Sequence, residues 1–266
     1  MFDSITGMTK EIVSVLNGNV HSFWLYGSVV QDDFRLGWSD IDMLVLTGKQ
    51  FTDSQAQELV QLRQIMAADA PGNPYYPLFE GVIANLDEYL SGTFSRLVYW
   101  GTTGQRITDR YKPDPFSQYE LAMNGKSVYG SDDRRIFTVP DRKTLIEAVR
   151  SHYETIRKYA QQTDGRLYSC GWLLDICRCI HTLRNNDVIS KTQAGIWALQ
   201  EHIFPYEDPL KKTIEIRKEP TAYKNQEDIQ QWLKGLGPVV QRYADVLECE
   251  LSGTAVIKET AKNVKT

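Results

Sequence analysis

The sequence is poor in three features that quickly narrow the class of a protein: cysteine, long apolar runs and an excess of one charge. It has only 4 cysteines in 266 residues, and 30 Lys and Arg against 34 Asp and Glu give a formal net charge of −4. No apolar run approaches the length that spans a bilayer, so no membrane partner is expected. The mild negative charge argues against a surface that is basic throughout. No nucleic-acid partner is expected, although a local basic pocket could hold a triphosphate.

The cysteines do not have the spacing of a metal site. They are Cys170, Cys177, Cys179 and Cys249. On a helix, Cys177 and Cys179 would point about 200° apart and could not bind one ion. Cys170 and Cys177 would share a helix face, as buried thiols often do. Met1 to Asn17 has no apolar segment followed by a small-residue cleavage site. We therefore expect reduced core cysteines in a cytoplasmic protein.

The first half of the chain alternates between helical and strand patterns. Amphipathic spacing predicts helices over Ser4–Leu16 and Ser54–Ala68. Strands are predicted over His21–Tyr26, Asp40–Thr47 and Leu78–Ala84. The run Asp40–Thr47 is almost continuously apolar, which is typical of a strand buried on both faces. This order of elements predicts a small mixed α/β sheet.

The second half, from Thr144 onward, is helical in its periodicity. Further helices are predicted over Trp172–Leu183, Lys191–His202 and Glu227–Leu251. Proline and charged residues at Pro140–Lys143 separate the two patterns. The predicted architecture is therefore a mixed-sheet domain over residues 1–140, followed by a C-terminal helical-bundle domain over residues 141–266.

Asp40 and Asp42 form the first candidate site. Because one residue separates them on a predicted strand, their side chains emerge on the same face. Two such carboxylates repel each other unless a cation lies between them. Mg²⁺ prefers one or two carboxylates with phosphate oxygens and water, so the pair predicts a Mg²⁺ site for a nucleoside triphosphate. Earlier in the chain, Gly27 allows close backbone approach and the Ser28 hydroxyl can bind phosphate oxygens.

Glu80 is a third acid, in an apolar strand where a charge is costly unless it binds metal or takes part in chemistry. It is either a metal ligand or a general base that removes a proton from an attacking hydroxyl. A lone Asp-x-Asp is usually a turn or a solvated edge, and a lone Gly-Ser is usually a loop. Their combination with an acid on a third strand is far more specific, and it indicates catalysis.

Two segments carry a family resemblance. Residues 25–28, Leu-Tyr-Gly-Ser, and residues 39–45, Ser-Asp-Ile-Asp-Met-Leu-Val, resemble the signature of the DNA polymerase β-like nucleotidyltransferase superfamily. Within it, the chain is most similar to the bacterial aminoglycoside adenylyltransferases that modify streptomycin and spectinomycin. The resemblance implies that residues 1–140 are the nucleotidyltransferase domain, and that ATP and antibiotic meet between it and the helical domain. It also implies ATP as the AMP donor and a role in antibiotic resistance.

The resemblance extends to residues outside the signature. Residues 79–83, Phe-Glu-Gly-Val-Ile, are similar to the family strand that bears the catalytic base, which implies that role for Glu80. Residues 173–178 and 188–191 resemble the central helices of the second domain. By that resemblance Arg178 and Lys191 reach the triphosphate, where a leaving pyrophosphate needs cations beyond the metal.

Two aromatic residues each have two interpretations. Tyr223 resembles a tyrosine that packs on the adenine, and it is equally well explained as an ordinary loop aromatic. Trp100 lies near the position of a tryptophan that stacks on the antibiotic, but its spacing from Glu80 is shorter than in the family. A buried core tryptophan is therefore the favoured interpretation.

The sequence departs from the family where the cationic drug binds. Tyr168 occupies the position of a key aspartate, while Asp164 lies nearby and Asp175 lies on the following helix. A polycationic substrate needs carboxylates, so this departure affects the choice of acceptor and leaves AMP transfer untouched.

We therefore predict a Mg²⁺-dependent enzyme that transfers AMP from ATP to a hydroxyl of a small molecule, with aminoglycosides among the candidates. One alternative is a nucleotidyltransferase that acts on protein or RNA, and the lack of a basic stripe weighs against RNA. Another is a nucleotide-binding regulator without catalysis, against which the three acids weigh. The oligomeric state is not predicted.

Overall fold

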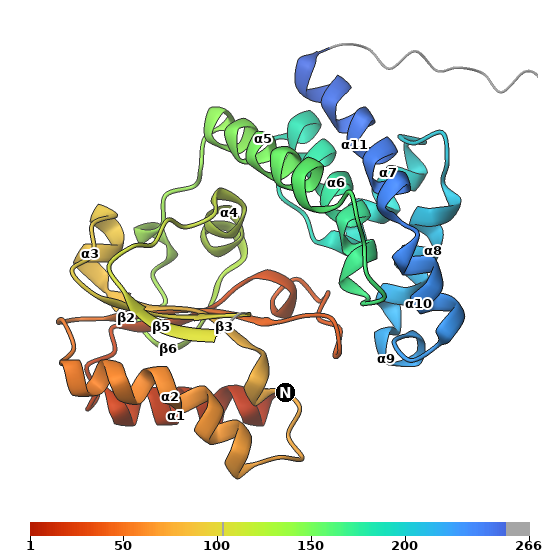
Figure 1. Cartoon of the computed structure of the whole chain (residues 1–266). Coiled ribbons are helices and arrows are strands. Elements are labelled where there is room, and N and C mark those ends of the chain that lie inside the picture. The colour runs from red at the N-terminus through yellow and green to blue at the C-terminus, as the bar shows by residue number, and fades with distance from the viewer. Residues whose placement is uncertain (103, 254–266) are drawn as a thin grey trace, which may run out of the picture. The chain divides into compact units, whose positions relative to one another are not determined.

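The computed structural model describes residues 1–102 and 104–253. The chain divides into two compact units. The first comprises Met1–Phe34 and Ser39–Pro140, and the second comprises Arg35–Trp38 and the chain from Asp141 onward. Figure 1 shows both units and labels most of their elements. In the described residues, no helix has the length and apolar character needed to cross a membrane.

The first unit is built on a six-stranded sheet with the strand order β5-β4-β3-β2-β1-β6. Its strands are β1 (Ser22–Leu25), β2 (Ile41–Thr47), β3 (Phe79–Asn85), β4 (Leu97–Gly101), β5 (Gly104–Thr108) and β6 (Lys126–Gly130). Strands β2 and β3 are parallel, whereas the other neighbouring pairs are antiparallel. The predicted mixed sheet is confirmed, and its only parallel pair joins the two strands that carry the acidic residues.

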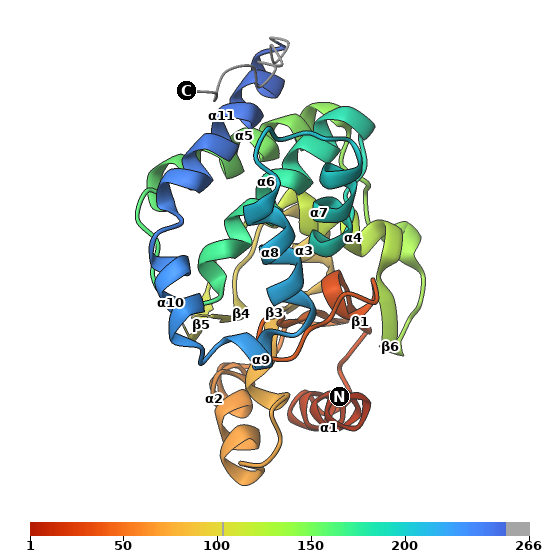
Figure 2. The same ribbon diagram turned by 90° about the vertical axis from the view of Figure 1, so that its right-hand side faces the viewer.

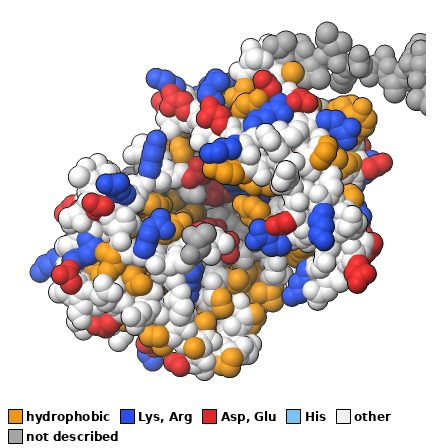
Figure 3. Space-filling model, in the orientation of Figure 1, with side chains coloured by type: hydrophobic (Ala, Val, Ile, Leu, Met, Phe, Trp, Pro, Cys, Tyr) orange, Lys and Arg blue, Asp and Glu red, His pale blue; other side chains and the backbone are white. Residues whose placement is uncertain are grey.

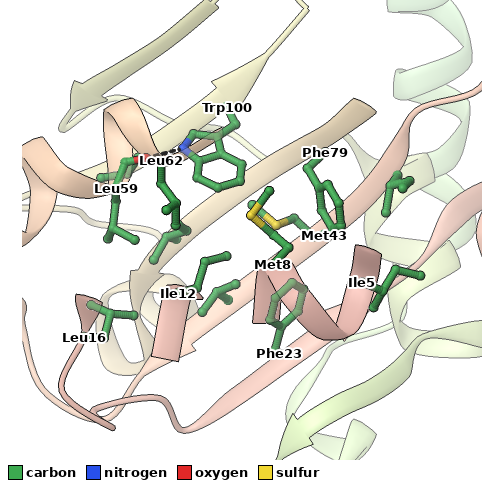
Figure 4. Close-up of a cluster of buried hydrophobic side chains, with 14 of the residues drawn as sticks. Ile5, Met8, Ile12, Leu16, Phe23, Met43, Leu59, Leu62, Phe79 and Trp100 are labelled. Atoms are coloured by element: carbon green, nitrogen blue, oxygen red, sulfur yellow. Dashed lines mark hydrogen bonds between the residues drawn. The ribbon is translucent and has the colours of Figure 1, made fainter. Parts of the chain in front are cut away.

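Helices cover both faces of this sheet. Helices α1 (Phe2–Val15) and α2 (Asp53–Asp69) lie on one face, and α3 (Leu86–Ser91) and α4 (Pro115–Asn124) lie on the other (Figure 1). Figure 4 shows the apolar cluster beneath α1 and α2, in which side chains of both helices meet those of β1 to β4. A second cluster fills the opposite face. Burial on both faces explains the nearly continuous apolar runs of β2 and β3.

The second unit is helical. It contains α5 (Arg142–Tyr159), α6 (Tyr168–Asn185), α7 (Lys191–Gln200), α8 (Asp208–Lys218), α9 (Pro220–Tyr223), α10 (Glu227–Lys234) and α11 (Gly237–Ser252). Helices α5, α7, α8 and α11 all pack on α6, which runs through the middle of the bundle (Figure 2). Cys170, Cys177 and Cys179 are buried free thiols on this central helix.

One predicted helix is wrong in its extent. The expected helix Glu227–Leu251 consists of α10 and α11, which are separated at Gly235 and Leu236. At Gly237 a Cβ atom would lie 2.9 Å from the carbonyl carbon of Gln161, so only glycine fits there. Pro238 then occupies the first turn of α11, where its missing N–H costs nothing. Packing against Gln161, which local periodicity does not encode, sets this break.

Charged side chains are mixed in sign on the surface that Figure 3 shows. Lys and Arg side chains lie among Asp and Glu side chains on that face. Within the helical unit, Arg157 on α5 pairs with Asp245 at 2.6 Å and Glu248 at 2.7 Å on α11. This mixture agrees with the near balance of charge in the sequence.

Candidate active site

Asp42 and Glu80 lie side by side on the parallel strands. They are register partners in the β2–β3 pair. Each strand buries every residue except its acid, which is half-buried. In a parallel pair, in-register residues point to the same face, so the two carboxylates open at one place on the sheet. The predicted strand positions of both acids are therefore confirmed, and the pairing of the strands brings them together.

Gly27 brings the backbone after β1 against the Asp42 carboxylate. Its φ is +66°, and a Cβ atom at this position would lie 3.2 Å from Asp42 Cγ and closer still to Oδ2. The preceding Tyr26 donates its N–H to the Asp42 carbonyl oxygen at 3.2 Å. Glycine is required here both for the left-handed backbone and for the space. Ser28 follows in the short 3₁₀ helix η1 (Gly27–Val29).

Asp40 immediately precedes β2 and is half-buried, like Asp42. In residues 1–102 and 104–253, no three His, Cys, Asp or Glu side chains form a group that could hold a metal ion. A site of two carboxylates suits Mg²⁺, which completes its shell with phosphate oxygens and water. The residues present therefore fit Mg²⁺ bound together with a triphosphate, rather than a metal held by protein ligands alone.

Two further residues, Arg63 and Tyr26, have charges or pKa values that are coupled to the acids. Arg63 on α2 donates to the carbonyl oxygens of Phe79, at 2.6 Å, and Gly101, at 3.0 Å. Burial lowers the pKa of Arg63, while the charges of Glu80 and Asp40 oppose that shift. Tyr26 is buried, and burial followed by the charge of Asp42 raises its pKa well above the usual range. A buried cation thus acts on Asp40 and Glu80, and the phenol stays neutral.

Glu80 has a polar neighbour, Thr102, which directly follows the adjacent strand β4. The hydroxyl of Thr102 donates to Glu80 Oε2 at 3.0 Å. A carboxylate that accepts such a bond is fixed in orientation yet keeps lone pairs for a second proton donor. This geometry is compatible with a general base.

In the helical unit, Asp175 holds the predicted phosphate-binding lysine. Its Oδ1 lies 2.9 Å from Lys191 Nζ, with the two side chains 12% and 26% exposed. Burial alone would raise the pKa of Asp175, but the charges of Lys191 and Arg178 lower it overall. Arg178 lies one turn after Asp175 on α6. Asp175 is therefore the counterion of Lys191, and the charge of Arg178 also acts on it.

Asp164 and Tyr168 lie near the start of α6. Asp164 pairs with Arg166 at 2.7 Å and accepts a bond from the Ser169 hydroxyl at 3.0 Å. Burial opposes the shift, but these bonds lower the pKa of Asp164. Tyr168 is 60% exposed, and its ring contacts that of Trp172 edge-on. Both candidate acids of this unit thus already have basic partners.

A cavity of about 390 Å³ opens beside Tyr168 within the second unit. It is lined by Gly37, Trp38, Gly165, Arg166, Leu167, Tyr168, Lys224, Asn225 and Gln230. The indole of Trp38 lies 5.3 Å from the guanidinium of the buried Arg217. The lining contains aromatic and basic side chains but no carboxylate, so it does not suit a polycation.

The two candidate aromatic residues, Trp100 and Tyr223, differ in their burial. Trp100 has no exposed surface, lies in the cluster of Figure 4 and donates its indole N–H to the carbonyl oxygen of Leu59 at 3.0 Å. It cannot stack on a ligand, so the interpretation as a core tryptophan holds. Tyr223 is half-buried at the end of α9, and its hydroxyl donates to Glu215 Oε1 at 2.6 Å.

Comparisons with known proteins bear on this arrangement. Residues 135–241 match the family model described as aminoglycoside adenylyltransferase, C-terminal domain. The chain is similar to the aminoglycoside adenylyltransferases. The predicted resemblance to these enzymes is thereby confirmed. No curated protein sequence matches the chain.

A solved structure shares the fold. It is spectinomycin adenyltransferase AAD(9) from Enterococcus faecialis, determined with ATP and spectinomycin. The TM-score is 0.62 at 18% sequence identity, over 93% of this chain and 99% of that chain. The predicted fold class, a mixed-sheet domain followed by a helical domain, is confirmed.

Sequence reasoning missed several residues around these groups. Arg63 on α2 donates to the carbonyl oxygen of Phe79, the residue before Glu80. Thr102, which follows β4, donates to the Glu80 carboxylate. The apolar run Leu97–Trp100 was a signal for β4, but nothing local showed which strand it would pair with. Trp38 lies only two residues before Asp40, and its packing on Arg217 had no signal in the sequence.

Proposed function

We propose that the protein transfers AMP from ATP to a hydroxyl group of a small acceptor. The observation that carries this proposal is the in-register pair Asp42 and Glu80, with Gly27 against the Asp42 carboxylate. Phosphoryl-transfer enzymes need little covalent chemistry, because positioning and charge do most of the catalysis. Two adjacent acids with different neighbours provide separate roles, one for a metal-bound phosphate and one for a proton.

In the proposed reaction, Glu80 accepts the proton of the acceptor hydroxyl as its oxygen attacks the α-phosphorus of ATP. The bond from that phosphorus to the bridging oxygen breaks in line, and pyrophosphate leaves with the electron pair. Asp40 and Asp42 would hold Mg²⁺, which supplies positive charge to the phosphate oxygens when bound. Gly27 and Ser28 would position the phosphates, while Tyr223 would pack on the adenine.

Arg178 and Lys191 are proposed to bind the triphosphate and to stabilise the leaving pyrophosphate. The support is their buried counterion: Asp175 holds Lys191 at 2.9 Å and lies one turn from Arg178. A lysine held by a carboxylate is pre-oriented, and a charge-assisted hydrogen bond from it to a phosphate oxygen is strong. Pre-organised charge of this kind acts on the transition state without reorganising.

The acceptor is proposed to be a compact antibiotic of the spectinomycin type rather than a polycationic one, and the consequence would be drug resistance. AAD(9), which shares the fold, was solved with ATP and spectinomycin. In this chain Asp164 and Asp175 already pair with Arg166 and Lys191. A polycation would have to displace those partners before it could bind a carboxylate.

Pyrophosphate release tests the proposal. Purified protein is incubated with labelled ATP, Mg²⁺ and separate pools of small hydroxyl compounds, of protein and of RNA. We expect release only with a small acceptor. Label on protein or RNA would replace the proposal with its first alternative. ATP binding with no transfer to any acceptor would favour a regulator without catalysis.

A further inference from the structure

The strand beside Glu80 brings a tyrosine to the same face. Strand β4 pairs with β3 so that Tyr99 is opposite Val82 and Trp100 is opposite Gly81. Continuing this antiparallel register places Gly101 across from Glu80. Since Val82 and Glu80 are two residues apart, Tyr99 and Glu80 share one face of the sheet.

Gly101 makes room for the phenol of Tyr99 beside the acid. A Cβ atom at position 101 would lie 2.9 Å from both Cζ and Oη of Tyr99. The ring of Tyr99 therefore lies over the backbone of residue 101, directly across from Glu80. Its hydroxyl thus lies on the face of the sheet from which Glu80 emerges, at the register position opposite that acid.

Two contacts complete this arrangement. The Thr102 hydroxyl donates to Glu80 Oε2 at 3.0 Å. Arg106, the partner of Tyr99 in the β4–β5 register, places its guanidinium carbon 4.3 Å from the centre of the phenol ring. Burial, followed by the charge of Glu80, raises the pKa of Tyr99, so its hydroxyl stays protonated at neutral pH and keeps a proton to donate.

We propose that Tyr99 and Thr102 are positioning residues that orient the Glu80 carboxylate toward the acceptor hydroxyl, with Arg106 holding Tyr99 in place. The proposal rests on the proposed role of Glu80 as the base. Two hydroxyl donors fix the rotation of the carboxylate and leave lone pairs for the proton that it takes. A base displaced by about 1 Å loses on the order of a hundredfold in rate, so such donors matter for turnover.

Kinetics of Tyr99→Phe and Thr102→Val test this role. We expect kcat to fall about tenfold for each, the equivalent of one hydrogen bond in the transition state, with KM for ATP changed less than about twofold. In a Glu80→Gln background neither change should lower kcat further. Tyr129→Phe is the control, because Tyr129 lies on β6 at the opposite edge of the sheet from β5.

The outcomes separate this proposal from the proposed function. If Glu80→Gln slows AMP transfer but Tyr99→Phe and Thr102→Val do not, the positioning role is wrong while the function stands. Full additivity with Glu80→Gln would also overturn it, because a purely structural role predicts additive losses.

If the wild-type protein transfers no AMP, the contacts of Glu80 can still be tested by a measurement that needs no turnover. The ¹³C resonance of the Glu80 side-chain carboxylate can be assigned by its loss in Glu80→Gln. We expect it to move in Tyr99→Phe and in Thr102→Val, and to stay in place in Tyr129→Phe. An unmoved resonance in both test variants would contradict the proposed contacts.

Discussion

Asp42 and Glu80 are direct neighbours on two parallel strands, although 37 other residues separate them in the chain. This is the only parallel pair in a sheet whose other neighbouring strands are antiparallel. Every other residue of the two strands is buried, so the two acids are the partly exposed positions of this strand pair. We propose separate tasks for the two acids, metal binding at Asp42 and proton transfer at Glu80.

Glu80→Gln should slow AMP transfer while leaving ATP binding unchanged. The amide keeps the size of the side chain but cannot accept the acceptor proton. General-base catalysis contributes on the order of a hundredfold to ten-thousandfold, and kcat should fall within that range. Single-turnover kinetics and ATP titration measure the two effects separately. Normal turnover would remove Glu80 from the role of base.

Asp42→Ala should abolish Mg²⁺-dependent turnover while the protein stays folded. Removing one of two repelling carboxylates relieves their repulsion, and the half-buried site leaves no sealed cavity. Loss of a bound Mg²⁺ costs several kcal/mol of charge stabilisation, or about a hundredfold or more in rate. Thermal unfolding serves as the control for folding. Near-normal activity that still responds to Mg²⁺ would show that Asp42 is not a ligand.

Gly27→Ala should damage the site as well as the fold, and Gly18→Ala provides a matched control. Both glycines have positive φ, +66° and +76°, so each alanine costs about 1 kcal/mol or more in backbone strain. Only at Gly27 would the new methyl group meet a carboxylate, that of Asp42, whereas nothing lies within 4 Å at Gly18.

We therefore expect both glycine variants to lose stability, and only Gly27→Ala to need more Mg²⁺ for half-maximal activity. Chemical denaturation gives the first quantity, and activity against Mg²⁺ concentration gives the second. Equal Mg²⁺ responses in the two variants would separate Gly27 from the acid site.

Asp175→Asn should weaken ATP binding by about tenfold, because Lys191 loses the carboxylate that holds it. The salt bridge at 2.9 Å is the contact that the change removes. Asp208→Asn is the control, since that side chain is 99% exposed. Titration with ATP measures both. Wild-type affinity in Asp175→Asn would show that Lys191 is not oriented by this acid.

Asp175→Asn should also make the free energy of unfolding less sensitive to pH in the acid range. Because the pKa of Asp175 is lowered in the folded protein, its contribution to stability is present above the unfolded pKa, about 3.9. This contribution is lost as pH falls through the lower, folded pKa. The free energy of unfolding of Asp175→Asn should therefore fall less steeply below about pH 5 than that of the wild-type protein. Parallel curves from urea denaturation would contradict this linkage.

The strands and acids of the first unit could be predicted from the sequence because their signals are local. Alternation and apolar runs define β2 and β3, and an acid inside such a run stands out, as Asp42 and Glu80 do. The spacing of Gly27 from the acids belongs to the same short motif. What the sequence could not show is which side chains meet across elements.

The partners of Asp175 and Glu80 illustrate that limit. From the sequence, Asp175 was a candidate for binding a cationic drug. In the structure it pairs with Lys191 at the start of α7. Tyr99 reaches Glu80 only through the pairing of β4 with β3, and Trp100, the next residue, points into the core. Strand pairing and helix packing are long-range properties, so a local pattern does not contain them.

The mass of the acceptor after reaction tests the central claim most directly. Wild-type protein and Glu80→Gln are each incubated with ATP, Mg²⁺ and either spectinomycin or streptomycin, and the antibiotics are then weighed by mass spectrometry. We predict that spectinomycin gains one AMP with the wild-type protein, gains far less with Glu80→Gln, and reacts faster than streptomycin. No AMP on either antibiotic or on any other small hydroxyl compound, under conditions in which the protein binds ATP, would contradict the account.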